Sequence, residues 1–243
     1  MNRNSPFSYV CNACGRCCHD KVITLSPYDV LRIARTRRIT TAEAIARYTI
    51  RRGSILKFTD HGACIALEGV RCGMHRGRPL ACRLYPLGIE RIDDSSDEQF
   101  VKLEPATGSL SVYGDQAAVE DFLAEQQVAP HLDANARYGS LLPKFRERID
   151  AIVDFDLVEP REFRRRAIRE ALAESGYDPN AIIDAIFDSD SVGCARDDDA
   201  ATVSAHLAVL STMICDERYP ETLAAAAVLL AVSLGYSPSE AMR

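Results

Sequence analysis

Four cysteines fall within eight residues near the N-terminus, in the run Cys11-Asn-Ala-Cys14-Gly-Arg-Cys17-Cys18. Three more follow along the chain, at Cys64, Cys72 and Cys82. Thiolates separated by two residues can bind the same metal, because the intervening turn brings both sulfurs within bonding distance. We interpret the two groups as halves of one metal or iron–sulfur site.

Seven thiols are more than one tetrahedral ligand set can use. Three sulfurs of the first group could occupy three corners of a four-iron (4Fe–4S) cluster, with Cys82 or Cys64 supplying the fourth ligand. Adjacent side chains point apart in extended backbone, so Cys17 and Cys18 are expected to have different roles. The surplus thiols leave open a second arrangement.

Two zinc ions would need eight ligands, and His75 or His19 could supply the eighth. A disulfide framework would leave one of the seven cysteines unpaired and would need an oxidising compartment. Residues 1–10 contain no apolar stretch typical of a signal peptide, and the longest apolar run, 223–234, is too short to span a bilayer. We therefore expect a cytoplasmic protein with reduced thiols and no membrane contact.

The charge is divided along the chain. Residues 1–90 carry 15 Lys and Arg against 6 Asp and Glu, whereas the remaining residues carry 14 against 29. The basic part could indicate nucleic acid, but arginines that offset the charge of seven thiolates explain it better. Arg78 and Arg83 flank Cys82 and are candidate cofactor-binding residues, because cations near sulfur stabilise an anionic cluster. Alternatively, they fasten the loop through backbone carbonyls.

Local patterns predict the supporting elements. Ser26-Pro27-Tyr28-Asp29 and Thr40-Thr41-Ala42-Glu43 are typical helix starts. Short strands are expected at 21–25, 55–58 and 63–67, followed by a meander of strands at 87–92, 100–103 and 110–113 with an acidic loop at 93–98. From residue 115 the apolar spacing is helical, with Val119, Phe122 and Leu123 on one face.

These elements predict a mostly α, α+β protein. An irregular cysteine-cluster domain with short helices and a small antiparallel sheet is expected at 1–114, and a helical region at 115–243. The basic run 161–169 is interpreted as a solvated helix face because glutamates flank it. The histidines without ligand-like neighbours are interpreted as non-functional: His61, His131 and His206. Cys194 and Cys215 belong to the helical region, and Cys215 is interpreted as a small buried hydrophobe.

The order C-x2-C-x2-C-C, then two cysteines, then R-P-x2-C-R-x-Y-P resembles the YkgJ-type CxxCxxCC family of zinc- or iron-chelating domains. The match covers about residues 7–90 and ends on Arg78, Pro79, Cys82, Arg83, Tyr85 and Pro86. The resemblance implies a metal ligand set drawn from Cys11, Cys14, Cys17, Cys18, Cys64, Cys72 and Cys82. His75 stands where the family often has tyrosine, so it is either a ligand or an exchange without consequence.

The family includes flagellin lysine N-methylase, which implies a cluster that works with S-adenosylmethionine. The usual glycine-rich G-x-G-x-x-G loop is absent from this chain, as are H-E-x-x-H, P-loop and G-x-S-x-G motifs. Three hypotheses follow. The chain binds iron or zinc in a redox, carrier or sensor role; it is a cluster-dependent protein lysine methyltransferase; or it is a structural zinc module that binds a protein partner.

Overall fold

The computed structural model describes residues 1–91, 98–155 and 176–236. The N-terminal part contains β1 (Pro6–Val10), the 3-10 turn η1 (Arg16–Cys18), α1 (Pro27–Arg37) and α2 (Thr41–Tyr48). Short elements follow: β2 (Thr49–Ile50), η2 (Arg51–Gly53), β3 (Ile55–Leu56), β4 (Leu67–Glu68), β5 (Arg71–Cys72), η3 (His75–Gly77) and α3 (Leu80–Leu84). Then come β6 (Leu87–Arg91), β7 (Glu98–Lys102) and β8 (Val112–Ala118).

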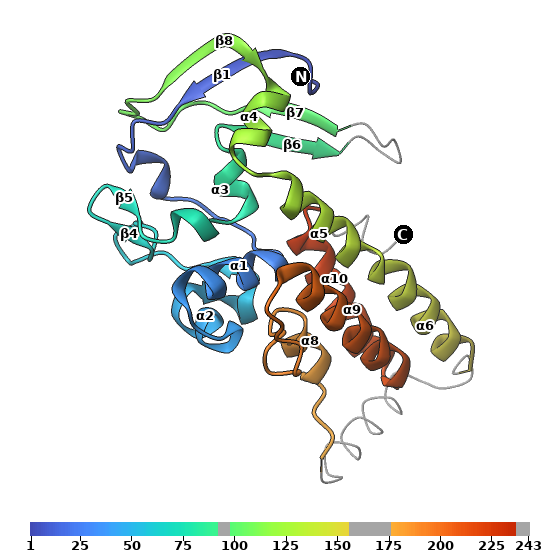
Figure 1. The fold of residues 1–243 in the computed structure, drawn as a ribbon. Helices are drawn as coiled ribbons and strands as arrows, with labels where there is room; N and C mark the ends of the chain where they lie inside the picture. Colours follow the sequence, from blue (N-terminus) through green and yellow to red (C-terminus); the bar gives the residue numbers. More distant parts are fainter. Residues whose placement is uncertain (92–97, 156–175, 237–243) are drawn as a thin grey trace.

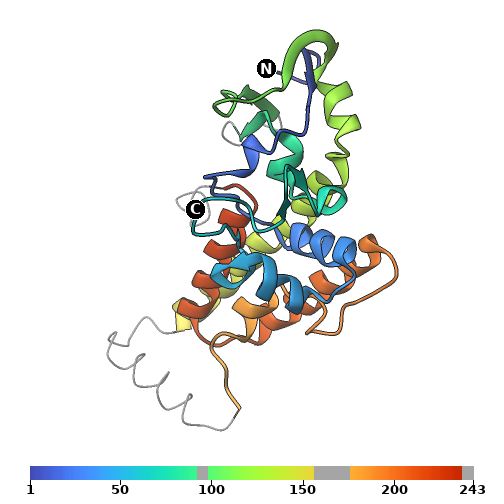
Figure 2. The same ribbon diagram turned by 90° about the vertical axis from the view of Figure 1, so that its left-hand side faces the viewer.

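The remaining described elements are helices: α4 (Val119–Glu125), α5 (Ala129–Gly139), α6 (Leu141–Phe155), α8 (Ala181–Ala185), α9 (Asp199–Asp216) and α10 (Pro220–Ser233). Helices α6, α9 and α10 run side by side, and α5 leads from the strands into this bundle (Figure 1). Helix α1 contacts α5 and α2, and both α1 and α2 lie in front of the bundle in the view of Figure 2. The α+β class with a helical C-terminal region is confirmed.

Both predicted helix starts are confirmed, and both are capping boxes. The Ser26 hydroxyl accepts a hydrogen bond from the Asp29 N–H, while the Asp29 carboxylate accepts from the Ser26 N–H. Thr40 and Glu43 make the same reciprocal pair at α2. Each box satisfies two backbone donors that the first helical turn leaves without partners.

The strands differ from the predicted meander. The described strands form four two-stranded antiparallel pairs, of which β6–β7 is the predicted hairpin. The prediction that the third strand continues the meander is wrong. That strand, β8, pairs with β1 instead, and Val10 lies opposite Val112. The prediction of a strand at 21–25 is also wrong, because in this segment only Thr24 forms an isolated β-bridge, which pairs it with Ile55. Pairing over such distances in the sequence is decided by packing and leaves no local pattern.

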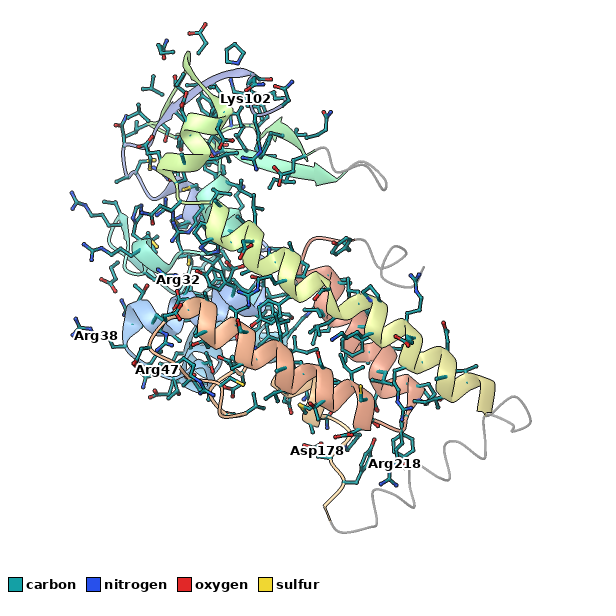
Figure 3. All side chains as sticks on the ribbon, turned by 45° about the vertical axis from the view of Figure 1, so that its right-hand side comes forward. Arg32, Arg38, Arg47, Lys102, Asp178 and Arg218 are labelled. Carbon is teal, nitrogen blue, oxygen red and sulfur yellow. The ribbon has the colours of Figure 1, made fainter. Side chains whose placement is uncertain are left out.

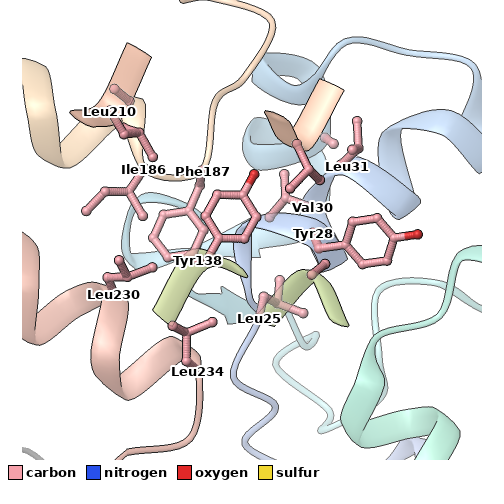
Figure 4. Packing of buried hydrophobic residues seen from close by; sticks show 14 of the residues in the cluster. Leu25, Tyr28, Val30, Leu31, Tyr138, Ile186, Phe187, Leu210, Leu230 and Leu234 are labelled. Carbon is pink, nitrogen blue, oxygen red and sulfur yellow. The ribbon is translucent and has the colours of Figure 1, made fainter. Parts of the chain in front are cut away.

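One hydrophobic core connects the cysteine-bearing part to the helical bundle. Its buried members include Leu25 and Leu56, Cys64 and Met74 from the cysteine loops, and Tyr138, Leu210 and Leu230 from the bundle (Figure 4 shows part of it). A second cluster, around Phe7, Phe100 and Phe122, holds the strands β1, β6 and β7 against α4. The division into 1–114 and 115–243 remains a prediction.

Three sequence-based expectations concern other positions. The prediction that Cys215 is buried is wrong, because the residue is exposed on α9, whereas Cys194 is buried. Cys215 follows the apolar residues Met213 and Ile214 in the sequence, but this pattern could not show which side of α9 the bundle covers. The basic run 161–169 lies outside the described residues, as does most of the acidic loop at 93–98.

Candidate metal centre

Backbone hydrogen bonds bring the two cysteine groups together. The Cys64 N–H donates to the Cys18 carbonyl at 2.8 Å, and the Asp20 N–H donates to the Gly62 carbonyl at 2.8 Å. His19 and Ala63 form an isolated antiparallel bridge between these contacts. The segment that carries the first four cysteines is thus fastened along the segment that carries Cys64.

Two glycines allow the cysteine loops to approach their neighbours closely. Gly15 has a left-handed φ of 71°, and a Cβ there would lie 3.3 Å from the Val70 carbonyl oxygen, in the turn between β4 and β5. A Cβ on Gly77 would lie 2.4 Å from the Arg32 carbonyl oxygen on α1. Glycine meets both demands because it has no Cβ. The C-x2-C turn therefore sits directly against the hairpin that carries Cys72.

The predicted ligands line one cavity of about 1240 Å³. Its wall includes all seven cysteines of the two groups and His75: Cys11, Cys14, Cys17, Cys18, Cys64, Cys72, Cys82 and His75. His19 does not line it; its Nδ1 donates to the Gly15 carbonyl at 3.1 Å instead. Cysteines up to 71 positions apart in the sequence thus line the same cavity. That they bind one metal site stays a prediction.

Five of the thiols form an inner group, defined here as Cys17, Cys18, Cys64, Cys72 and Cys82. The sulfurs of Cys17 and Cys18 are 4.0 Å apart. The charges of Cys17, Cys64 and Cys72 each act on the thiol of Cys82. Cys11, by contrast, is exposed. The cavity therefore has a partly buried thiol wall and a more open thiol, Cys11, toward solvent.

The thiols surround the cavity without closing on one point. Within residues 1–91, 98–155 and 176–236, no three His, Cys, Asp or Glu side chains have the mutual spacing of ligands to a single metal ion. The donor set nevertheless fits soft metals, because thiolates select zinc, Cu(I) and iron–sulfur clusters. The thiol side chains would have to rotate to bind a zinc ion or an iron–sulfur cluster.

The pKa values of the thiols differ with their surroundings. A hydrogen bond from the Cys18 thiol lowers the pKa of Cys17 to about 6 and raises the pKa of Cys18. Burial raises the pKa of Cys82 and, less strongly, those of Cys64 and Cys72. A thiolate is the form that binds a metal, so most inner thiols would release a proton when a cation binds.

Cys14 receives hydrogen bonds from a loop that the motif does not include. Backbone N–H groups of Leu110 and Arg16, followed by the Ser109 hydroxyl, lower the pKa of Cys14. Asn12 Nδ2 donates to the Leu110 carbonyl at 2.7 Å, which ties this loop to the cysteine run. The segment before β8 is thus part of the site, although it has no ligand residues.

Arg78 lines the cavity beside the thiols. Its Nη1 donates to the His75 carbonyl at 2.8 Å and approaches His75 Nδ1 at 3.2 Å, while Nη2 donates to Gln126 Oε1 at 2.5 Å. The charges of Cys82, Cys72 and Cys11 raise its pKa, although burial has the larger effect and lowers it. Because guanidinium only donates, His75 Nδ1 accepts from Arg78 and the proton of the neutral ring lies on Nε2, so His75 would have to give up this hydrogen bond to bind a metal through a ring nitrogen. Burial, Arg78 and Arg83 lower the pKa of His75.

Arg83 is buried behind the cavity wall and is not among the lining residues. Its guanidinium donates to three backbone carbonyls, those of Arg78 at 3.1 Å, Gln126 at 2.8 Å and Arg76 at 2.5 Å. The bonds to Arg76 and Arg78 satisfy acceptors in the irregular loop that precedes Cys82, and the bond to Gln126 ties this loop to the end of α4. Arg83 therefore fastens the loop, which is the second of the two roles that the sequence left open.

Asp29 and His131 support the site, and the sequence analysis missed this role for both. Asp29 lines the cavity, and its Oδ1 accepts hydrogen bonds from the Leu80 N–H at 2.9 Å and from His131 Nδ1 at 2.9 Å. Leu80 begins the helix that carries Cys82. Asp29 was identified only as a capping residue, and no local signal could have placed His131, which lies 102 positions away.

All nine cysteines of the chain are free. No helix among the described residues is long and apolar enough to cross a membrane.

Comparison with known proteins gives one match. Residues 10–106 match the family model CxxCxxCC, described as "Putative zinc- or iron-chelating domain". No curated protein and no solved structure matches the chain. The matched segment contains all seven clustered cysteines, His75 and the strands β2 to β7, but it excludes β8 and the helical bundle. Residues 10–106 are therefore similar to the CxxCxxCC domain, and the similarity extends over this N-terminal segment.

Proposed function

We propose that the chain binds iron as a four-iron four-sulfur cluster in the thiol-lined cavity. The observation that carries the proposal is the convergence of seven thiols, from segments 11–18 and 64–82, on one space of about 1240 Å³. The cysteines would remain free in a reducing compartment such as the cytoplasm.

The inner thiols are the proposed ligands. Cys64, Cys72 and Cys82 come from the second cysteine group, and Cys17 supplies the fourth sulfur, with its pKa already lowered by Cys18. A four-iron cluster held by four thiolates is anionic, and Arg78 places a cation beside Cys72 and Cys82. Such a cation stabilises the reduced cluster and raises its reduction potential. Redox, carrier and sensor roles all agree with this arrangement.

The extent of the cavity favours a second candidate, a protein lysine methyltransferase that uses S-adenosylmethionine. Beyond the thiols the cavity reaches the bundle, where Leu132 and Asn135 of α5 and Ser233, Leu234 and Gly235 at the end of α10 line it. This part has space for an organic co-substrate next to the metal. A structural zinc module is the third candidate, and the donor chemistry alone does not separate it from iron.

Anaerobic purification tests the proposal, with absorption spectroscopy and with iron, zinc and acid-labile sulfide analysis on the same sample. We expect a brown protein with iron and sulfide in near-equal amounts. A colourless protein with one or two zinc ions would overturn the cluster in favour of the structural module. Titration calorimetry with S-adenosylmethionine on the brown protein tests the second candidate, which requires saturable binding.

A further inference from the structure

The exposed apolar side chains of the described residues gather around the mouth of the cysteine cavity. Nine large hydrophobic residues are exposed, and four of them line the cavity: Val10, Val22, Val70 and Leu103. Val22 is the most exposed, at 79%. Two more exposed apolar residues lie next to the cavity: Val112 pairs with Val10, and the Leu110 N–H donates to Cys14. We call these six residues the apolar rim.

The loops that carry the rim lie along one side of the molecule, where the open end of the β1–β8 ribbon stands above η1 and the β4–β5 hairpin (Figure 1). Exposed apolar residues gathered at one place on a protein usually mark a binding site. Because four rim residues line the same cavity as the thiols, a protein that covers the rim would also limit access to the thiols.

Cations accompany the apolar rim. Lys21 precedes Val22, and Arg71 follows Val70; both are exposed and line the cavity. Neither side chain makes an ion pair with any described residue. By contrast, every arginine of α1 and α2 makes an ion pair: Arg32, Arg35, Arg37 and Arg47. The carboxylates that line the cavity are Asp29, Glu98, Glu104 and Glu125, of which Glu104 is the neighbour of a rim residue, Leu103. Two cations without an ion-pair partner among the described residues are thus the sequence neighbours of two exposed rim valines, Val22 and Val70.

We propose that the apolar rim is a docking surface for another protein, one that presents an apolar segment flanked by aspartate or glutamate. Apolar contacts with Val22 and Val70 would supply affinity, and carboxylates facing Lys21 and Arg71 would supply orientation and a faster approach. The proposal does not depend on which metal the cavity holds.

Two other occupants fit the surface less well. A second copy could offer its helical bundle, but none of the exposed large hydrophobic residues lies between 113 and 236 in the described chain. A rim-to-rim dimer would set the same cations against each other. A membrane surface favours protruding aromatic or leucine side chains, whereas this rim is mostly valine around a concave cavity.

The test uses the full chain and a fluorescein-labelled twelve-residue peptide in which leucine alternates with glutamate. Binding is measured by fluorescence anisotropy for the wild type and for two double variants, Lys21→Glu with Arg71→Glu and Val22→Ser with Val70→Ser. We expect Kd to rise on the order of tenfold in each double variant. A peptide with lysine in place of glutamate should bind more weakly to the wild type.

The matched controls are Arg218→Glu and Ile50→Ser, an exposed cation and an exposed apolar residue that do not line the cavity (Figure 3 labels Arg218 at the far end of the bundle). They should leave Kd unchanged. Equal Kd in all variants would overturn the proposal, as would rim-dependent binding to phosphatidylserine-containing vesicles without peptide binding, or rim-dependent dimers in sedimentation. Metal content is measured on every preparation, so failure of the metal assignment is recorded separately.

Discussion

Asp29 Oδ1 and His131 Nδ1 lie 2.9 Å apart, with the two side chains 3% and 2% exposed. The same carboxylate accepts from the Leu80 N–H and, through Oδ2, from the Ser26 N–H and hydroxyl. One buried group therefore joins the start of α1, the start of the helix that carries Cys82, and α5 of the bundle. The position of Cys82 depends on a contact that spans the two parts of the chain.

Asp29→Asn should destabilise the protein and loosen Cys82. The amide keeps the shape but replaces one acceptor oxygen with a donor, so at least one buried partner loses its bond. Hydrogen bonds to charged groups contribute about 1.5–3 kcal/mol each, and we expect a loss of that order in the free energy of unfolding, measured with urea. Exposed Asp184→Asn, which removes an ion pair with Arg52, should cost less than about 1 kcal/mol. Equal losses in both variants would contradict the supporting role of Asp29.

Replacement of inner thiols should abolish metal retention. Cys64→Ser and Cys82→Ser each remove a partly or fully buried cavity sulfur, and serine is a poor ligand for soft metals. Cys215→Ser is the control, because that thiol is exposed on α9 and does not line the cavity. Metal and sulfide analysis per chain is the measurement. Wild-type metal content in the cavity variants would refute the ligand assignment.

Gly15→Ala should weaken both the fold and metal binding. Alanine in the left-handed region costs about 1–2 kcal/mol, and its Cβ would also press on the Val70 carbonyl. Gly69→Ala is a matched control with a similar φ of 64° and no atom within 4 Å of the added Cβ. Urea unfolding and metal titration should both show the larger loss for Gly15→Ala. A larger loss for Gly69→Ala would mean that the close approach has no consequence.

Acid should destabilise the bundle through His206. Its Nε2–H donates to the Ala185 carbonyl and its Nδ1 accepts from the Tyr138 hydroxyl, both at 2.8 Å, so the buried ring is held neutral. Burial lowers the pKa of His206. The unfolded chain therefore takes up a proton near pH 6.5 that the folded chain refuses, and stability falls as pH drops through that value.

The measurement is the urea midpoint at pH 7.5 and 5.5. His206→Gln keeps a donor but does not titrate, so its midpoint should fall less over this range than that of the wild type. His75, whose pKa is also lowered, is present in both proteins and contributes equally. An identical fall in both proteins would exclude His206 as the cause.

The sequence predicted what local chemistry controls. Both capping boxes were readable because a cap and its partner lie three residues apart, and the cysteine spacing predicted that Cys11 to Cys18 and Cys64 to Cys82 face one space. The partner of β8 and the exposure of Cys215 were not readable, because each depends on which surfaces meet in the folded chain. Asp29 illustrates the limit best: its capping role is local and was predicted, whereas its bond to His131 is a tertiary contact.

Cys64 and Met74 are buried in the same core as the bundle helices. We therefore expect apolar packing to hold the cavity wall without a bound metal, unlike the small zinc modules whose folding depends on their ion. Metal binding would then be an insertion into a folded scaffold, accompanied by proton loss from the thiols. A chelator should then strip the centre and leave a folded protein that can be refilled.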